Sequence, residues 1–96
     1  MYSDNEIIFK IRKDILMDRL ELGDLGVTLD SITPDSVLMD DSGLGLDSVD
    51  ALDVLVAVQQ IFGFTIETID RAFIEDKCHT VRSLATYVGS QQSQQA

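Results

Sequence analysis

The sequence predicts an all-α fold: a four-helix bundle of three longer helices and one short third helix, with a long loop between the first two helices. Apolar residues recur at helical spacing in several stretches, and capping residues or glycines mark the ends of these stretches. No stretch alternates apolar and polar residues for long enough to form a strand. With 96 residues, 45% of them hydrophobic, the chain fits one domain with one small core. We expect this domain to span residues 1–89 and the Ser/Gln-rich residues 90–96 to be disordered.

The first helix is predicted from Asp4 to Leu20. Ser3 and the glutamate three residues later form a capping-box pattern at its start. Isoleucines then repeat at helical spacing, and Gly23 and Gly26 are expected to stop the helix.

The loop that follows, residues 25–46, is long for a connection in a compact domain. Loops of this length are usually functional or contain a short element of their own. Residues 33–36 read Thr-Pro-Asp-Ser, which is typical of a turn or a single helical turn. Apolar side chains are expected to pin the loop to the core, namely Val27, Leu29, Ile32, Val37, Leu38 and Leu44.

The second helix is predicted from Ser48 to Phe62, with Gly63 just past its end. Asp47 and Ser48 come directly before an apolar run, which is a helix start signal, so Ser48 lies at an open junction of loop and helix. At about 100° per residue, one side of this helix gathers a core face: Ala51, Val54, Leu55, Val58, Ile61 and Phe62.

The opposite side of the second helix is also apolar. Val49, Leu52 and Val56 gather there, mixed with Asp53 and flanked by Asp50. An amphipathic helix of a small protein should be polar on that side. A helix buried on several sides would explain the pattern, but so short a chain can hardly bury one. We therefore interpret these three residues as an exposed docking stripe that begins beside the serine.

Two further helices complete the bundle. A short helix is predicted from Thr68 to Asp76, with apolar residues Ile69, Phe73 and Ile74. A last helix is predicted to be capped by Thr80, to run through Val88 and to end at Gly89.

The net charge of −10 is concentrated in one part of the chain. Residues 20–70, the acidic segment, contain eleven Asp or Glu and no Lys or Arg. Such a field repels nucleic acid and anionic membranes and attracts basic protein surfaces, although solubility alone would also favour acids. No run is long and apolar enough for a membrane span, and the N-terminus lacks the features of a signal peptide. A single cysteine, Cys78, agrees with a reducing compartment, and we expect a cytoplasmic protein.

The residues do not assemble into a catalytic or metal site. Nucleophilic catalysis by Ser48 would need a neighbouring base. The one histidine, His79, follows Cys78 directly, and adjacent residues of a helix do not face one another. Metal binding by this pair would need further ligands. Residues 40–43, Asp-Asp-Ser-Gly, do not fit the template of a calcium-binding loop. We expect no catalytic residue, no metal and no enzymatic activity.

The motif Leu46-Asp47-Ser48-Val49-Asp50 resembles the Asp-Ser-Leu signature of the acyl carrier protein family, with valine in place of leucine. The similarity covers most of the chain. It extends over the first helix, the loop residues 32–36, Ile61-Phe62-Gly63, Ile66, Thr80-Val81 and Tyr87-Val88.

The resemblance implies a four-helix bundle in which Ser48 carries 4′-phosphopantetheine through a phosphodiester bond. The thiol of that arm would hold an acyl group as a thioester. The implied partners are a phosphopantetheinyl transferase and the acyl-transferring and condensing enzymes, which have basic docking surfaces, and the protein would be a monomer. The implied partner-binding residues are the acids Asp47, Asp50 and Asp53 and the apolar Val49, Leu52 and Val56.

The sequence also departs from the family pattern. Gln59 and Gln60 stand where many members have acids, and the loop before the motif and residues 67–77 are slightly extended. These differences favour a carrier dedicated to a specialised lipid or polyketide-like pathway over one that serves housekeeping fatty-acid synthesis. An aminoacyl or peptidyl carrier loaded by an adenylating enzyme remains an alternative, as does an unmodified interaction module with the same fold.

Overall fold

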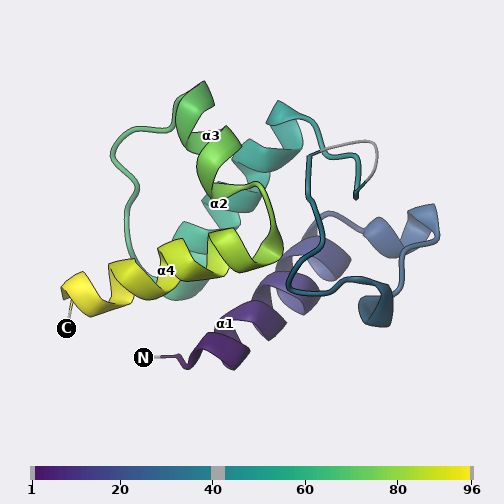
Figure 1. Ribbon diagram of the computed structural model, residues 1–96, viewed down its shortest axis with the longest axis horizontal. Helices are drawn as coiled ribbons and strands as arrows, with labels where there is room; N and C mark the ends of the chain where they lie inside the picture. The colour runs from purple at the N-terminus through teal and green to yellow at the C-terminus, as the bar shows by residue number, and fades with distance from the viewer. Residues whose placement is uncertain (1, 40–42, 96) are drawn as a thin grey trace.

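The computed structural model, which describes residues 2–39 and 43–95, is a bundle of four helical segments (Figure 1). The first is α1 (Asp4–Lys10), which continues without a break into the π-helical segment η1 (Ile11–Arg19). Ser3 and Glu6 form the predicted capping box, since each side chain accepts a hydrogen bond from the backbone N–H of the other. The prediction of one long first helix is confirmed.

Two short 3₁₀ turns follow the first helix, η2 (Leu22–Leu25) just before the long loop and η3 (Leu29–Ser31) within it. The first helix ends earlier than Gly23, because Glu21 already adopts a left-handed backbone with φ of 54°. The predicted turn at residues 33–36 is present, with the N–H of Ser36 donating to the carbonyl of Thr33 over 3.0 Å.

The loop is fixed to the helices at several points. Ile32 and Leu38 are fully buried, as predicted, and the other four loop residues expected to pack are half-buried. Arg12 of η1 donates from Nη2 to the carbonyl of Leu29 at 2.7 Å. The N–H of Leu38 donates to the carbonyl of His79 at 3.0 Å. The chain before the second helix is therefore tied both to η1 and to the residues that precede the last helix.

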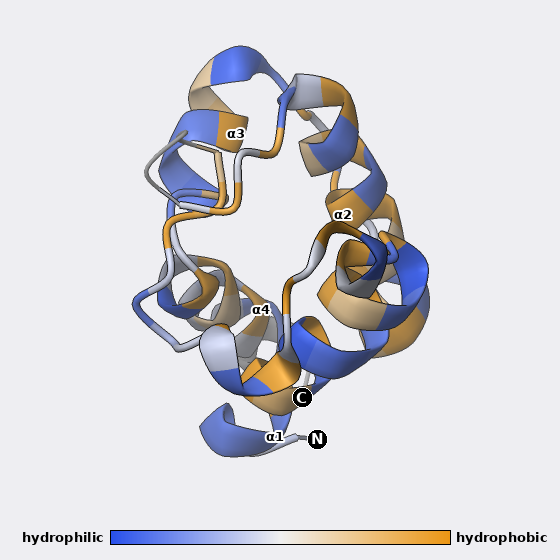
Figure 2. Cartoon of the chain, turned by 90° about the vertical axis from the view of Figure 1, so that its right-hand side faces the viewer, coloured by the Kyte–Doolittle hydropathy of each residue, from blue (hydrophilic) through white to orange (hydrophobic). Residues whose placement is uncertain are grey.

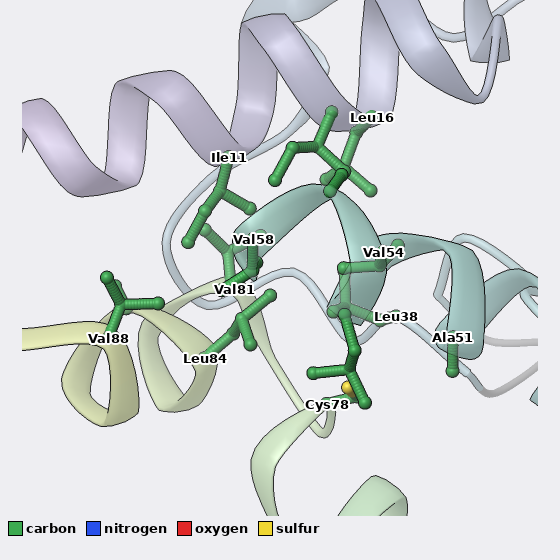
Figure 3. Close-up of a cluster of buried hydrophobic side chains, with 14 of the residues drawn as sticks. Ile11, Leu16, Leu38, Ala51, Val54, Val58, Cys78, Val81, Leu84 and Val88 are labelled. Atoms are coloured by element: carbon green, nitrogen blue, oxygen red, sulfur yellow. The ribbon is translucent and has the colours of Figure 1, made fainter. Parts of the chain in front are cut away.

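Helix α2 (Ser48–Phe62) has the predicted bounds, and Gly63 ends it with a left-handed φ of 75°. Its inner face meets η1, the last helix of the chain and the loop in one core (Figure 3). Ile61 of the predicted core face is only half-buried, whereas Ala57 is buried. The other predicted core positions of α2 are buried, namely Ala51, Val54, Leu55, Val58 and Phe62.

Helix α3 (Arg71–Lys77) begins three residues later than the predicted start at Thr68. The reason is local, because Asp70 caps the helix by accepting a hydrogen bond from the N–H of Phe73 at 2.8 Å. The prediction that the bundle contains four helices, with the third one short, is confirmed. The described residues form no strand, only an isolated antiparallel bridge between Val37 and Thr80.

Helix α4 (Val81–Gln95) corrects the predicted C-terminus, because it continues through Gly89 and does not end there. A Cβ atom on Gly89 would lie 4.0 Å from Cδ1 of Ile7, so this turn of α4 runs along α1. Gln92 then accepts from the N–H of Tyr2 and donates to its carbonyl, at 2.9 and 3.1 Å. Residues 90–95 therefore continue α4, while Ala96 lies outside the described residues. The start of α1 and the end of α4 lie on the same side of the molecule (Figure 1).

Candidate functional site

Ser48 is the first residue of α2, and its side chain is exposed. The loop before it is fixed by backbone bonds from Leu44 N–H to Val37 O, at 2.8 Å, and from Leu46 N–H to Leu38 O, at 2.9 Å. A Cβ atom on Gly43 would overlap the carbonyl oxygen of Val37, so only glycine fits at this close approach. These contacts hold the start of α2 in a defined position on the surface.

Asp47 and Asp50 form a reciprocal cap around Ser48. Asp47 Oδ1 accepts from the N–H of Asp50 at 2.9 Å, and Asp50 Oδ2 accepts from the N–H of Asp47 at 3.3 Å. The prediction that α2 starts at this motif is confirmed, with Asp47 as the N-cap and Ser48 as the first helical residue.

A phosphodiester on the hydroxyl of Ser48 fits this position. The N–H groups in the first turn of a helix have no partner within the helix, and the helix dipole favours negative charge there. The dipole of α2 therefore favours a phosphate group attached to its first residue, while the N–H of Asp50 is already bound by Asp47. Because Ser48 is exposed, an arm attached to its hydroxyl begins at the surface of the protein.

The apolar side chains on the outer face of α2 are exposed. Val49, Leu52 and Val56 expose 70%, 42% and 40% of their surface. Figure 2 shows hydrophobic residues along this helix, with hydrophilic residues between some of them. The alternative that α2 is buried on several sides is therefore wrong, and the three residues form a continuous apolar stripe beside Ser48. We call it the docking stripe.

The third acid of this face, Asp53, forms an ion pair with Arg19 that the sequence did not predict. Arg19, the last residue of η1, donates to Asp53 Oδ1 from Nε at 3.0 Å and from Nη2 at 2.9 Å. The hydrogen bonding to Asp53 raises the pKa of Arg19. The two residues are 34 positions apart, and the one signal in the sequence is that Arg19 is the last cation before the acidic segment.

The two glutamines near the end of α2 also have structural partners. Gln59 accepts from the N–H of Ile66 at 2.9 Å and donates to the carbonyl of Leu55 at 3.2 Å, which links α2 to the segment that follows it. Gln60 accepts from Nη1 of Arg19 at 3.0 Å. Gln59 therefore stabilises the fold through its hydrogen bonds, in addition to leaving this position without a negative charge.

The Cys-His pair does not form a reactive site. Cys78 is buried, and burial raises the pKa of its thiol to about 11, so the thiol stays protonated. His79 is exposed. No group of three or more His, Cys, Asp or Glu that could hold a metal occurs among the described residues, and Asp40, Asp41 and Ser42 lie outside them. Over the same part of the chain, no helix is long and apolar enough to cross a membrane.

A small helical bundle that presents one exposed serine at a helix start, next to an apolar stripe, has the features of a protein that displays a group to other proteins. The family model of the phosphopantetheine attachment site matches residues 22–88, which include this serine. The chain therefore belongs to the family of phosphopantetheine-binding carrier proteins. Its cofactor is 4′-phosphopantetheine, attached covalently.

Proposed function

We propose that this chain is an acyl carrier protein and that Ser48 is the residue to which 4′-phosphopantetheine is attached. The observation that carries the proposal is the exposure of Ser48 at the capped start of α2, within the region that matches the attachment-site family. The thiol of the arm then holds an acyl group as a thioester. Ser48 needs no base of its own, because the transferase that modifies it supplies the catalytic groups.

The outer face of α2 supplies the partner-binding residues of this proposal. The docking stripe offers apolar contact area next to Ser48, and Asp47 and Asp50 offer negative charge to a basic enzyme surface. The partners are a phosphopantetheinyl transferase and acyl-transferring and condensing enzymes. The chain performs no catalysis itself, and we propose that it acts as a monomer in the cytoplasm.

A specialised lipid or polyketide-like pathway is the proposed setting. The C-terminal half of α2 lacks the acids expected of a housekeeping carrier, and Gln59 and Gln60 are both engaged in hydrogen bonds there. A housekeeping enzyme with basic groups opposite these positions would find no negative charge to bind.

The proposal is tested by incubating the purified chain with coenzyme A and a phosphopantetheinyl transferase. Coenzyme A supplies phosphopantetheine to the Ser48 hydroxyl, and 3′,5′-adenosine bisphosphate leaves. We expect the mass of one phosphopantetheine group on the wild type and none on Ser48→Ala, whose fold should survive because an exposed residue of the first helical turn contributes little to stability. Modification of the alanine variant would show that another residue carries the arm.

A further inference from the structure

Arg19 uses all three nitrogen atoms of its guanidinium on the outer face of α2. Nε and Nη2 bind Asp53 Oδ1, and Nη1 binds Gln60 Oε1, all at 2.9–3.0 Å. Asp53 and Gln60 are seven residues apart, so the contact covers about 10 Å along the helix. The planar fork of arginine makes this double attachment possible, which a lysine could not reproduce.

The outer face of α2 is therefore graded in charge. Asp47 and Asp50, beside Ser48, take part in no ion pair among the described residues, since they accept only each other's backbone N–H groups. Farther along, the charge of Asp53 is balanced by Arg19, and Gln60 is uncharged. The negative potential of this face is thus confined to the end that bears the serine.

We infer that Arg19 is a specificity-determining residue of the docking face. This inference rests on the proposed function, because it assumes that enzymes dock on α2 to reach Ser48. The partner that fits is an enzyme surface with basic groups opposite Asp47 and Asp50 and an uncharged, largely apolar surface opposite residues 53–60. A cation of the partner placed opposite Asp53 would have to displace a guanidinium with three bonded nitrogens, and it would then lie beside the freed charge of Arg19.

A double-mutant cycle on the loading reaction tests this inference. The enzyme is a phosphopantetheinyl transferase whose docking surface is basic opposite Asp53 as well as opposite Asp47 and Asp50, the kind of partner that Arg19 should disfavour. The rate of Ser48 modification, expressed as kcat/KM at low salt, is measured for the wild type, Arg19→Gln, Asp53→Asn and the double variant. Arg19→Gln should raise kcat/KM by about twofold to fivefold, the range that exposed ion pairs give, because Asp53 becomes available to the basic enzyme. Asp53→Asn should cost correspondingly more in the Arg19→Gln background than in the wild-type background.

Two further variants make the cycle specific. Lys13→Gln removes the same charge from the same helical segment, but Lys13 is paired with Asp18 and not with α2. It should leave the cost of Asp53→Asn unchanged, so a general effect of net charge is separated from the local one. Arg19→Lys keeps the charge and cannot bind Asp53 and Gln60 together, so it should shift kcat/KM in the same direction as Arg19→Gln, even if the glutamine variant folds poorly.

The outcomes separate this inference from the proposed function. If the wild type is not modified at Ser48 at all, both fail. If the wild type is modified and Asp53→Asn costs the same in both backgrounds, Arg19 does not control access to Asp53 and only the inference is wrong. A fall in kcat/KM for Arg19→Gln, with an intact fold by circular dichroism, would also overturn the inference, since Arg19 would then contact the partner directly.

Discussion

Replacing Val56 with aspartate tests whether this residue of α2 serves the docking of a partner or the packing of the core. Val56 exposes 40% of its surface, so about 60% is covered. Because burying a whole valine side chain is worth about 1.5–3 kcal/mol, the change removes at most about 1–2 kcal/mol. Valine and aspartate have similar helix propensities, so the backbone adds little. We expect a fall in Tm of about 4–8 °C for each kcal/mol lost, which leaves the domain folded.

Leu55→Asp is the matched control, one residue away on the core face. Leu55 is 0% exposed and lies in the main hydrophobic cluster. A carboxylate there would be buried without a partner, at a cost of several kcal/mol beyond the lost packing. That sum is comparable to the whole stability of a small domain, about 5–15 kcal/mol. We expect Leu55→Asp to unfold the protein.

Thermal melts and the reactivity of Cys78 report the two outcomes independently. The thiol is buried and its pKa is raised to about 11, so it should react slowly with a thiol reagent near pH 8 while the domain is folded. We expect protection in Val56→Asp and rapid reaction in Leu55→Asp.

The loading reaction at Ser48 completes the Val56 prediction. An unpaired charge on the docking stripe should reduce kcat/KM about tenfold or more, because it would be desolvated against the partner. Thr86→Asp, which adds the same charge at an exposed position of α4, should be loaded normally. Equal and severe losses of stability in the two α2 variants would refute the docking stripe, as would wild-type loading of Val56→Asp.

Three further predictions follow from the contacts described above. Gly43→Ala should disturb the loop before the serine, because its methyl group would overlap the carbonyl of Val37; slower loading together with a lower Tm checks this, and an unchanged Tm would contradict it. Exchange with housekeeping fatty-acid enzymes should be poor and should improve with Gln60→Glu. Full activity of the wild type with the housekeeping enzymes would remove the main support for a specialised pathway. Gln59→Glu should instead lower Tm by several degrees, because it loses the hydrogen bond that Gln59 donates to a helix carbonyl. Added salt or a divalent cation should raise Tm, because the acidic segment repels itself and salt screens that repulsion over about 10 Å at 0.1 M; a flat or falling Tm would show that the repulsion is negligible.

Local signals predicted the start and end of α2 better than they predicted the start of α3 and the end of α4. The bounds of α2 follow from an aspartate cap and a left-handed glycine, both readable over a few residues. The predicted start of α3 was wrong because Thr68 and Asp70 are both good N-cap residues, and only the fold selects between them. The extension of α4 past Gly89 depends on its packing along α1 and on the bonds between Gln92 and Tyr2. Such contacts between distant positions leave no local pattern.

On the outer face of α2, the sequence predicted the exposed apolar residues but not the ion pair of Asp53. Helical periodicity placed Val49, Leu52 and Val56 on a side opposite the core, and all three are exposed. Periodicity cannot say which charges meet, so the ion pair between Asp53 and Arg19 emerged only from the packing of η1 against α2.

The intact mass of the protein isolated from its native host tests the carrier assignment of Ser48 most directly. We expect a phosphopantetheine increment on the peptide that contains Ser48. On part of the population we expect a further mass that hydroxylamine removes, because thioesters are cleaved under conditions that leave the phosphodiester intact. The size of that further mass would identify the cargo as acyl or aminoacyl. Ser48 found unmodified throughout, in a host with an active phosphopantetheinyl transferase, would contradict the carrier assignment and favour an interaction module that keeps only the fold.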